Sequence, residues 1–220
     1  MTAHRSLMLA VFLTVASFVG RPVAADPVLD FTNGNATPSG NDVTVGWKFT
    51  VGVGSPIVIG GLGVFDIGAN GLAEDHQIAL WKSDASLLAS ATIKADGSNS
   101  TPVASTSSLG DWRSTPITPL ALLPGDYVVG AFYKANTADY IVYQATASNL
   151  KVTWDESRYT FGSSFVFPSL HYAPDDAAYF GPNLFTVATP PVPEPTSLIL
   201  LGSGLAGLAG RFAWRKRRPK

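Results

Sequence analysis

The segment from residue 66 to residue 76 holds the densest group of potential metal ligands in the chain. Oxygen donors on a glycine-containing loop suit Ca²⁺, which takes about six to eight oxygens, so a calcium site is one hypothesis here. The spacing is not that of an EF-hand, because Gly68 and Gln77 stand where ligands would be required. The alternative is a Gly/Asn turn with solvated carboxylates before a strand that begins at His76. The candidate ligands are Asp66, Asn70, Glu74 and Asp75.

Side chains that could perform catalysis are few and scattered. His76 and His171 are the only histidines beyond residue 25, and no pattern brings them together. A glycosidase needs two carboxyl groups that flank the bond to be cut. Neither Asp155-Glu156 nor Asp175-Asp176 is such a pair by itself, because adjacent residues on a strand point to opposite faces. The chain has no cysteine, nucleophile elbow or zinc-protease motif. The sequence therefore predicts a non-enzymatic protein without a cofactor, and a secreted glycan hydrolase is the less favoured alternative.

Aromatic side chains give a stronger indication of binding, because ring faces stack on sugars as well as filling protein cores. Trp47 and Trp81 lie inside apolar strands and are expected in the core. Trp112 follows a polar loop and stands between two charged residues, so it is a better candidate for exposure. These considerations make a carbohydrate-binding module the main alternative function. The candidate stacking residues are Trp112, Tyr140, Tyr143 and Tyr159.

Charge is distributed unevenly along the 220 residues. The formal net charge is −1, but residues 26–190 carry seven Lys and Arg against fifteen Asp and Glu. Phosphate binding needs clustered Lys and Arg, so this acidic body is not expected to bind nucleic acid.

The elements that must position these residues are predicted to be strands. Apolar and polar residues alternate from Val43 to Val51, which places five apolar side chains on one face. Gly60-Gly61 and Gly63 suggest a bulge or a sharp bend in the next strand, and residues 83–86 suit a hairpin loop. The polar segment 95–108 is expected to be an exposed, mobile loop. Further strands are predicted at 57–65, 76–82, 87–94, 127–133 paired with 140–144, 152–154, 159–167 and 184–187. This pattern indicates an all-β fold, an antiparallel β-sandwich or jelly roll, over residues 26–189.

The N-terminal 25 residues are predicted to be a signal peptide. Basic residues precede an apolar run of about a dozen residues, and small residues lead to a cleavage site between Ala25 and Asp26. The run is shorter than the roughly 20 residues that span a bilayer. We therefore expect the secretion machinery to export the chain.

The C-terminus has three consecutive parts. Residues 190–196 form a Pro-rich linker, 197–214 are predicted to form a transmembrane helix, and 215–220 form a basic cytoplasmic tail. At about 1.5 Å per residue the helix reaches about 27 Å, enough for a thin bilayer core. Cations after an apolar helix keep that end cytoplasmic. The basic cluster comprises Arg211, Arg215, Lys216, Arg217, Arg218 and Lys220.

This tail closely resembles the PEP-CTERM sorting signal of Gram-negative bacteria. The resemblance rests on Val192-Pro193-Glu194-Pro195, followed in order by the apolar helix and the terminal basic cluster. It implies that an exosortase, a membrane-embedded cysteine transpeptidase, recognises the Pro-Glu-Pro motif and cuts there. It also implies an inner-membrane-anchored precursor whose body passes to the cell surface or extracellular matrix, commonly alongside exopolysaccharide.

Residues 46–133 show a second resemblance, to a bacterial family of all-β surface domains of unassigned function. It rests on Gly46-Trp47-Lys48-Phe49, Ile78-Ala79-Leu80-Trp81, the run 87–92, Trp112-Arg113 and the run 125–131. The family implies a β-sandwich and supplies no catalytic residues.

Overall fold

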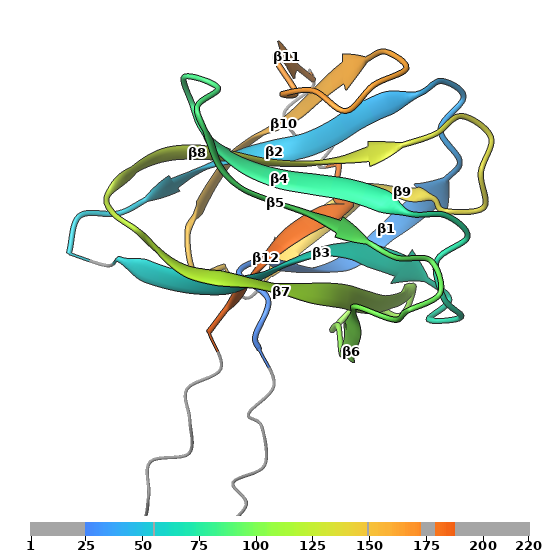
Figure 1. Cartoon of the computed structure of the whole chain (residues 1–220), viewed down its shortest axis with the longest axis horizontal. Helices are drawn as coiled ribbons and strands as arrows, with labels where there is room; N and C mark the ends of the chain where they lie inside the picture. Colours follow the sequence, from blue (N-terminus) through green and yellow to red (C-terminus); the bar gives the residue numbers. More distant parts are fainter. Residues whose placement is uncertain (1–24, 55, 149, 173–178, 188–220) are drawn as a thin grey trace, which may run out of the picture. The chain divides into compact units, whose positions relative to one another are not determined.

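The structure, a computed structural model, describes residues 25–187 except residues 55, 149 and 173–178 (Figure 1). This part contains twelve strands and no helix. Accordingly, none of its residues belongs to a helix that could cross a membrane. The predictions for the signal peptide before Ala25, the Pro-Glu-Pro motif, the transmembrane helix and the basic tail fall outside the described residues, as does Asp175-Asp176.

The strands form three antiparallel sheets. A six-stranded sheet has the order β11-β10-β2-β8-β4-β5, a four-stranded sheet has the order β12-β3-β7-β6, and β1 pairs with β9. Figure 1 shows the two larger sheets as facing layers. The predicted all-β, sandwich-like architecture is confirmed. The strands are β1 Asp30–Thr37, β2 Val43–Val51, β3 Ile57–Ile67, β4 His76–Lys82, β5 Leu87–Ile93, β6 Thr101–Val103, β7 Gly110–Leu122, β8 Gly125–Tyr133, β9 Ile141–Ser148, β10 Thr153–Phe161, β11 Leu170–His171 and β12 Pro182–Thr186.

Strand β2 forms where the alternation predicted it, and its apolar face is buried in the core. Trp47 and Phe49 are fully buried, and their rings lie 5.0 Å apart. The Trp47 indole donates a hydrogen bond of 2.8 Å to the Pro182 carbonyl of β12. This bond joins a strand of the six-stranded sheet to one of the four-stranded sheet.

The polar face of the six-stranded sheet is covered by the segment that follows β10. Phe165 and Phe167 pack against Trp81 of β4, with ring centroids 5.4 Å and 5.7 Å apart. The backbone amide of Val166 donates to the hydroxyl of Thr44, which is completely buried. The prediction of one strand from 159 to 167 is therefore wrong beyond Phe161, because the later residues cross over the sheet instead of extending it.

Strand β3 contains the bulge predicted from its glycines. Against β12 the extra residue is Gly60, because Thr186 and Phe185 lie opposite Ile59 and Gly61; the register against β7 also shifts here, and Gly61 lies opposite Pro116. A proline cannot donate to a strand ladder, so it is tolerated where the ladder is already interrupted. This arrangement accommodates Pro116 within β7, a long strand that the sequence patterns did not indicate.

The predicted pairing of 127–133 with 140–144 is wrong. Strand β8 pairs with β2 and β4, whereas β9 pairs with β1. The connection around Asn136, which has a positive φ of 59°, passes from one sheet to another instead of closing a hairpin. The hairpin at residues 83–86 is confirmed by the pairing of β4 with β5 and by the bond from Lys82 N–H to Ser86 O.

The first and last described residues lie side by side. The amide of Thr186 donates to Asp26 O over 2.9 Å, and the amide of Val28 donates to Leu184 O over 2.8 Å. The buried Asn183 side chain bonds both backbone groups of Leu29, 154 residues earlier in the chain. The start of the body is thus fixed to β12, its last strand.

Candidate functional site

The acidic segment 66–76 does not gather its oxygens into one site. Asp66 is buried and accepts hydrogen bonds of 2.8 Å from Arg113 Nε and 2.9 Å from the Gly71 amide. The second bond closes the turn after β3, where Gly68 and Ala69 have positive φ values. Asn70 is exposed on this turn. Asp66 therefore anchors a Gly/Asn turn to β7.

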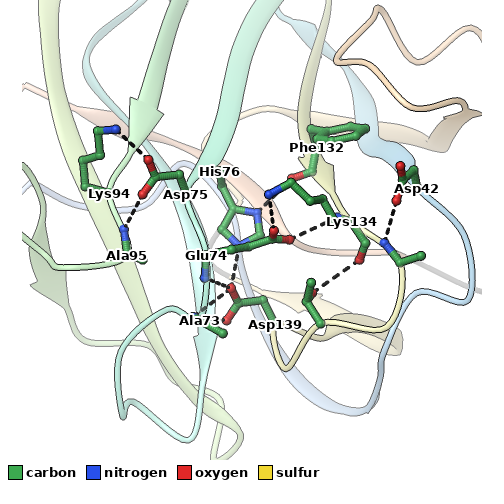
Figure 2. Close-up of polar contacts among 12 residues, drawn as sticks. Asp42, Ala73, Glu74, Asp75, His76, Lys94, Ala95, Phe132, Lys134 and Asp139 are labelled. Carbon is green, nitrogen blue, oxygen red and sulfur yellow. Dashed lines mark hydrogen bonds and ion pairs between the residues drawn. The ribbon is translucent and has the colours of Figure 1, made fainter.

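Glu74 and Asp75 each pair with a different lysine (Figure 2). Glu74 lies 2.7 Å from Lys134 Nζ, and Asp75 lies 2.6 Å from Lys94 Nζ. The hydrogen bonds from Lys94 and from the Ala95 amide lower the pKa of Asp75 below its usual range. Within residues 25–187, with the gaps noted above, no three Asp, Glu, His or Cys side chains lie close enough to hold a metal ion. The structure does not bring the four predicted calcium ligands together.

The buried polar centre of this region is a pair that we call the His76–Asp139 clasp. The His76 ring is completely buried; its Nε2 lies 2.9 Å from Asp139 Oδ2 and its Nδ1 lies 2.8 Å from Phe132 O (Figure 2). Asp139 also accepts the amides of Ala73 and Glu74 at 2.9 Å. The clasp therefore ties β4 and the segment before it to the connection between β8 and β9.

The clasp has no hydrogen-bonding capacity left for an external substrate. A carbonyl oxygen can only accept, so Nδ1 donates to Phe132 O, and Nε2 is engaged in the hydrogen bond with the Asp139 carboxylate. Burial alone would raise the pKa of Asp139, but hydrogen bonds from His76, Ala73 and Glu74 outweigh it and lower the pKa. Both ring nitrogens are occupied and the ring is inaccessible. The expectation that His76 is a satisfied polar residue at a strand start is confirmed.

Trp112 lies in the core, and the prediction that it is exposed is wrong. Its ring is fully buried at centroid distances of 4.9 Å from Phe65 and 5.6 Å from Phe31. Its indole donates to the buried carboxylate of Asp30 over 3.1 Å. The charged neighbours that suggested exposure instead point away from it, as expected for alternate residues on a strand. Trp112 cannot stack on a glycan in this fold.

Asp30 also orders part of the loop predicted to be exposed and mobile. Its carboxylate accepts hydrogen bonds of 2.6 Å from Ser105 Oγ and 2.6 Å from the Thr106 amide. Burial raises its pKa, and the bonds from Ser105, Thr106 and Trp112 together reverse that effect and lower it. Residues 101–103 form β6 and Ser107 is buried. The prediction for residues 95–108 is therefore wrong at β6 and at Ser107, whereas the other residues of the segment are exposed or half-buried, and Asp30 holds only Ser105 and Thr106.

The three candidate tyrosines are half-buried, and two of them belong to one aromatic cluster. Tyr143 stacks on Tyr179 with centroids 6.3 Å apart, and Tyr159 lies 5.2 Å from Phe161 and 6.1 Å from Tyr172. Tyr172 and Tyr179 complete the series at 4.5 Å. Tyr140, also half-buried, has no ring contact among the described aromatic side chains.

Four of these rings line a pocket at the end of β10, which we call the aromatic pocket. It has a volume of about 380 Å³ and is lined by the turn at residues 38–41 and by residues of the strands β1, β2, β9 and β10. Small-ligand pockets typically measure about 300–1,000 Å³. The rings are Tyr159, Phe161, Tyr172 and Tyr179. Only Tyr159 was among the sequence candidates.

Charge near the aromatic pocket is balanced. Arg158, which lines the pocket, pairs with Glu156, and Glu156 Oε2 lies 2.5 Å from His171 Nδ1. Arg158 Nη1 donates to Ser169 O over 3.0 Å, which holds the returning segment against β10. Of the acidic doublet at residues 155–156, Glu156 thus takes part in an ion-pair network at the pocket. Asp155 lies near Lys48 on the neighbouring strand β2.

Comparisons with known proteins match only the C-terminal segment. Residues 191–218 match the family described as the PEP-CTERM protein-sorting motif. No curated protein and no solved structure matches the chain. The match covers all four residues of the predicted Val-Pro-Glu-Pro motif and most of the basic cluster. This chain is therefore an exported protein that carries a PEP-CTERM sorting motif for processing by exosortase, a membrane protein.

Proposed function

We propose that this protein is a non-enzymatic component of the cell surface or extracellular matrix, displaying a β-sandwich that associates with exopolysaccharide. The observation that carries the proposal is the sorting motif at residues 191–218, downstream of the folded body. The secretion machinery would act on the N-terminal signal, and exosortase would act on the Pro-Glu-Pro motif of the membrane-anchored precursor.

The body supports a display role more than a catalytic one. Its buried ionisable groups are engaged in architecture: Asp30 orders a loop, Asp66 closes a turn, and the clasp joins two connections. A general acid or base must reach a substrate proton, and the two imidazole nitrogens of His76 are already bonded inside the protein. The aromatic pocket, by contrast, offers binding surface, which favours carbohydrate binding as the more specific role.

Sorting is tested by changing the motif in the full chain. Glu194→Ala, or deletion of residues 211–220, should leave precursor in the membrane and reduce the surface-delivered form. Intact mass of the released wild-type product should place its new C-terminus near residues 193–196. Asp84→Ala, which removes an exposed carboxylate from the body, is the matched control and should be delivered normally. Normal processing of both motif variants would refute the sorting role.

A further inference from the structure

We infer that the aromatic pocket binds a neutral sugar ring of a polysaccharide. This inference rests on the proposed function and deepens it, because it assigns the association to one site and one class of ligand. Three features of the pocket support it: the aromatic wall, the polar wall and the charge of the surroundings.

The aromatic wall is preorganised. Its rings meet nearly edge to face, with interplanar angles of 65° between Tyr159 and Phe161, 72° between Tyr159 and Tyr172, and 74° between Tyr172 and Tyr179. Such contacts each contribute about 0.5–1.5 kcal/mol and fix the rings before a ligand arrives. Phe161 nevertheless remains 58% exposed. The C–H face of a sugar ring, which is weakly positive, packs favourably on the negative face of an aromatic ring.

The opposite wall is polar and fixed to the same strand end. The turn at residues 38–41 contributes Ser39 and Asn41 to the lining. It is held by the bond from the Asn136 amide to Ser39 O, and the Gly162 amide bonds Asp42 O just beyond the turn. A sugar presents hydroxyl groups around its edge, so a ring stacked on one wall would meet hydrogen-bonding groups on the other. The Ser39 hydroxyl already donates to the Asn41 carbonyl, so the exposed Asn41 side chain is the group of this turn that would meet a sugar hydroxyl.

Charge favours a neutral ligand over an acidic one. Arg158 is the one charged residue among the described lining residues, and Glu156 already neutralises it. The body as a whole has an excess of eight acidic side chains between residues 26 and 190, which would repel a polyanion. Burial and a hydrogen bond with Tyr172 raise the pKa of Tyr179, so its phenol is a neutral hydrogen-bonding group at physiological pH.

The test measures binding of the full chain to defined polysaccharides. The protein is kept in a zwitterionic detergent without a sugar headgroup, since a glycoside detergent would compete for the pocket. The probes are soluble β-1,4-glucan, α-mannan and galactan, with alginate as the acidic comparison. We expect saturable binding to at least one neutral polymer, competed by its own oligosaccharide and stronger than binding to alginate.

Variants at one exposed ring connect binding to the pocket. Phe161→Ala should weaken binding by at least about tenfold, because a stacked ring loses most of its contact area. Phe161→Tyr keeps the ring and should retain binding within about threefold. Leu87→Ala on β5 is the matched control, because Leu87 is 59% exposed but lies outside the pocket, and it should bind like the wild type. Unchanged near-ultraviolet circular dichroism verifies that each variant is folded.

The possible outcomes distinguish an error in the assigned site from an error in the proposed function. If a neutral polymer binds but Phe161→Ala binds it equally well, the pocket assignment is wrong while polysaccharide association stands. If no neutral polymer binds, or if alginate binds best, the inference of a neutral sugar site is overturned. In neither case does surface delivery through the sorting motif depend on the result.

Discussion

The His76–Asp139 clasp and the aromatic pocket are both built from polar and aromatic side chains, yet they differ in how much hydrogen-bonding capacity and exposed surface they keep for a ligand. In the clasp every polar atom of the His76 and Asp139 side chains is hydrogen-bonded within the protein, and the imidazole is completely buried. In the pocket four rings keep part of their surface open, and Phe161 is more than half exposed. The difference separates groups that hold the fold together from groups that are available to a ligand.

Comparing the two regions shows why residue type alone is a weak guide to a binding site. A histidine beside acidic residues in a sequence suggests a catalytic role, but here both ring nitrogens of the histidine are hydrogen-bonded within the protein. Phenylalanine and tyrosine suggest a core, but where a strand ends beside a turn their faces stay accessible. We therefore expect changes to the clasp to act on stability and changes to the pocket to act on recognition.

The largest effect is expected from breaking the clasp. Asp139→Ala leaves the buried imidazole without its carboxylate and frees two amides, so the free energy of unfolding should fall by about 3–5 kcal/mol. Urea denaturation measures the change. Asp155→Ala is the control, because Asp155 belongs to a partly exposed pair 3.9 Å from Lys48 and should cost less than about 1 kcal/mol. Equal losses in the two variants would show that the clasp is not a special point of the structure.

Acid should weaken the fold through Asp30 and Asp139. Both carboxyls have pKa values below their ordinary range, so the unfolded chain binds more protons than the folded one at acidic pH. The stability they provide is complete above about pH 4–5 and is lost as the pH falls through the lowered pKa values. A tenfold difference in proton affinity between the folded and unfolded chain corresponds to about 1.4 kcal/mol. Denaturation between pH 2 and pH 7 follows the loss. Asp30→Asn should flatten part of the slope, and an unchanged slope would exclude Asp30 as its source.

Removing a pocket ring should barely affect stability. Phe161→Ala removes a side chain that is 58% exposed, so the free energy of unfolding should change by less than about 1 kcal/mol. Thermal unfolding beside Trp47→Ala, whose fully buried ring should cost about 3–5 kcal/mol, gives the contrast. A loss of several kcal/mol in Phe161→Ala would mean that the pocket rings belong to the core.

The smallest effect is expected from calcium. A specific site would add about 2.7 kcal/mol at a concentration 100 times the dissociation constant. The acidic side chains are already paired with basic ones: Asp66 with Arg113, Glu74 with Lys134 and Asp75 with Lys94. We therefore expect calcium to change the stability only slightly, and we expect magnesium to produce the same change. Asp66→Ala should not alter this response. Thermal unfolding with chelator, calcium and magnesium distinguishes the cases. A rise of several degrees in Tm that only calcium produces would contradict this interpretation.

The local features of the fold could be predicted because they depend on neighbouring residues. Alternation gave β2 its correct bounds, and the glycines of β3 indicated the bulge at Gly60. Pairing between distant strands could not be predicted in this way. Strands β8 and β9 follow one another in the chain, but the connection after Tyr133 carries the backbone to another sheet.

The site was harder to predict because burial and contact are decided by distant partners. Trp112 has charged neighbours in sequence, yet its environment is set by Asp30, 82 residues away. No sequence pattern distinguished Asp139 from the other acidic residues, because its structural role depends on its hydrogen bond with His76. The pocket rings come from β10, from the residue after β11 and from the segment before β12, which no spacing rule connects. Only the C-terminal motif, which is linear, could be recognised residue by residue.

The junction of Leu29 with Asn183 also sets the timing of folding. The Val28 amide and the backbone of Leu29 find these partners only when β12 has been synthesised and exported, because they bond to Leu184 and Asn183. Contacts so far apart in sequence close slowly. The chain should therefore cross the membrane without a completed core, and its final closure should coincide with arrival of the sorting tail that follows a short distance behind β12.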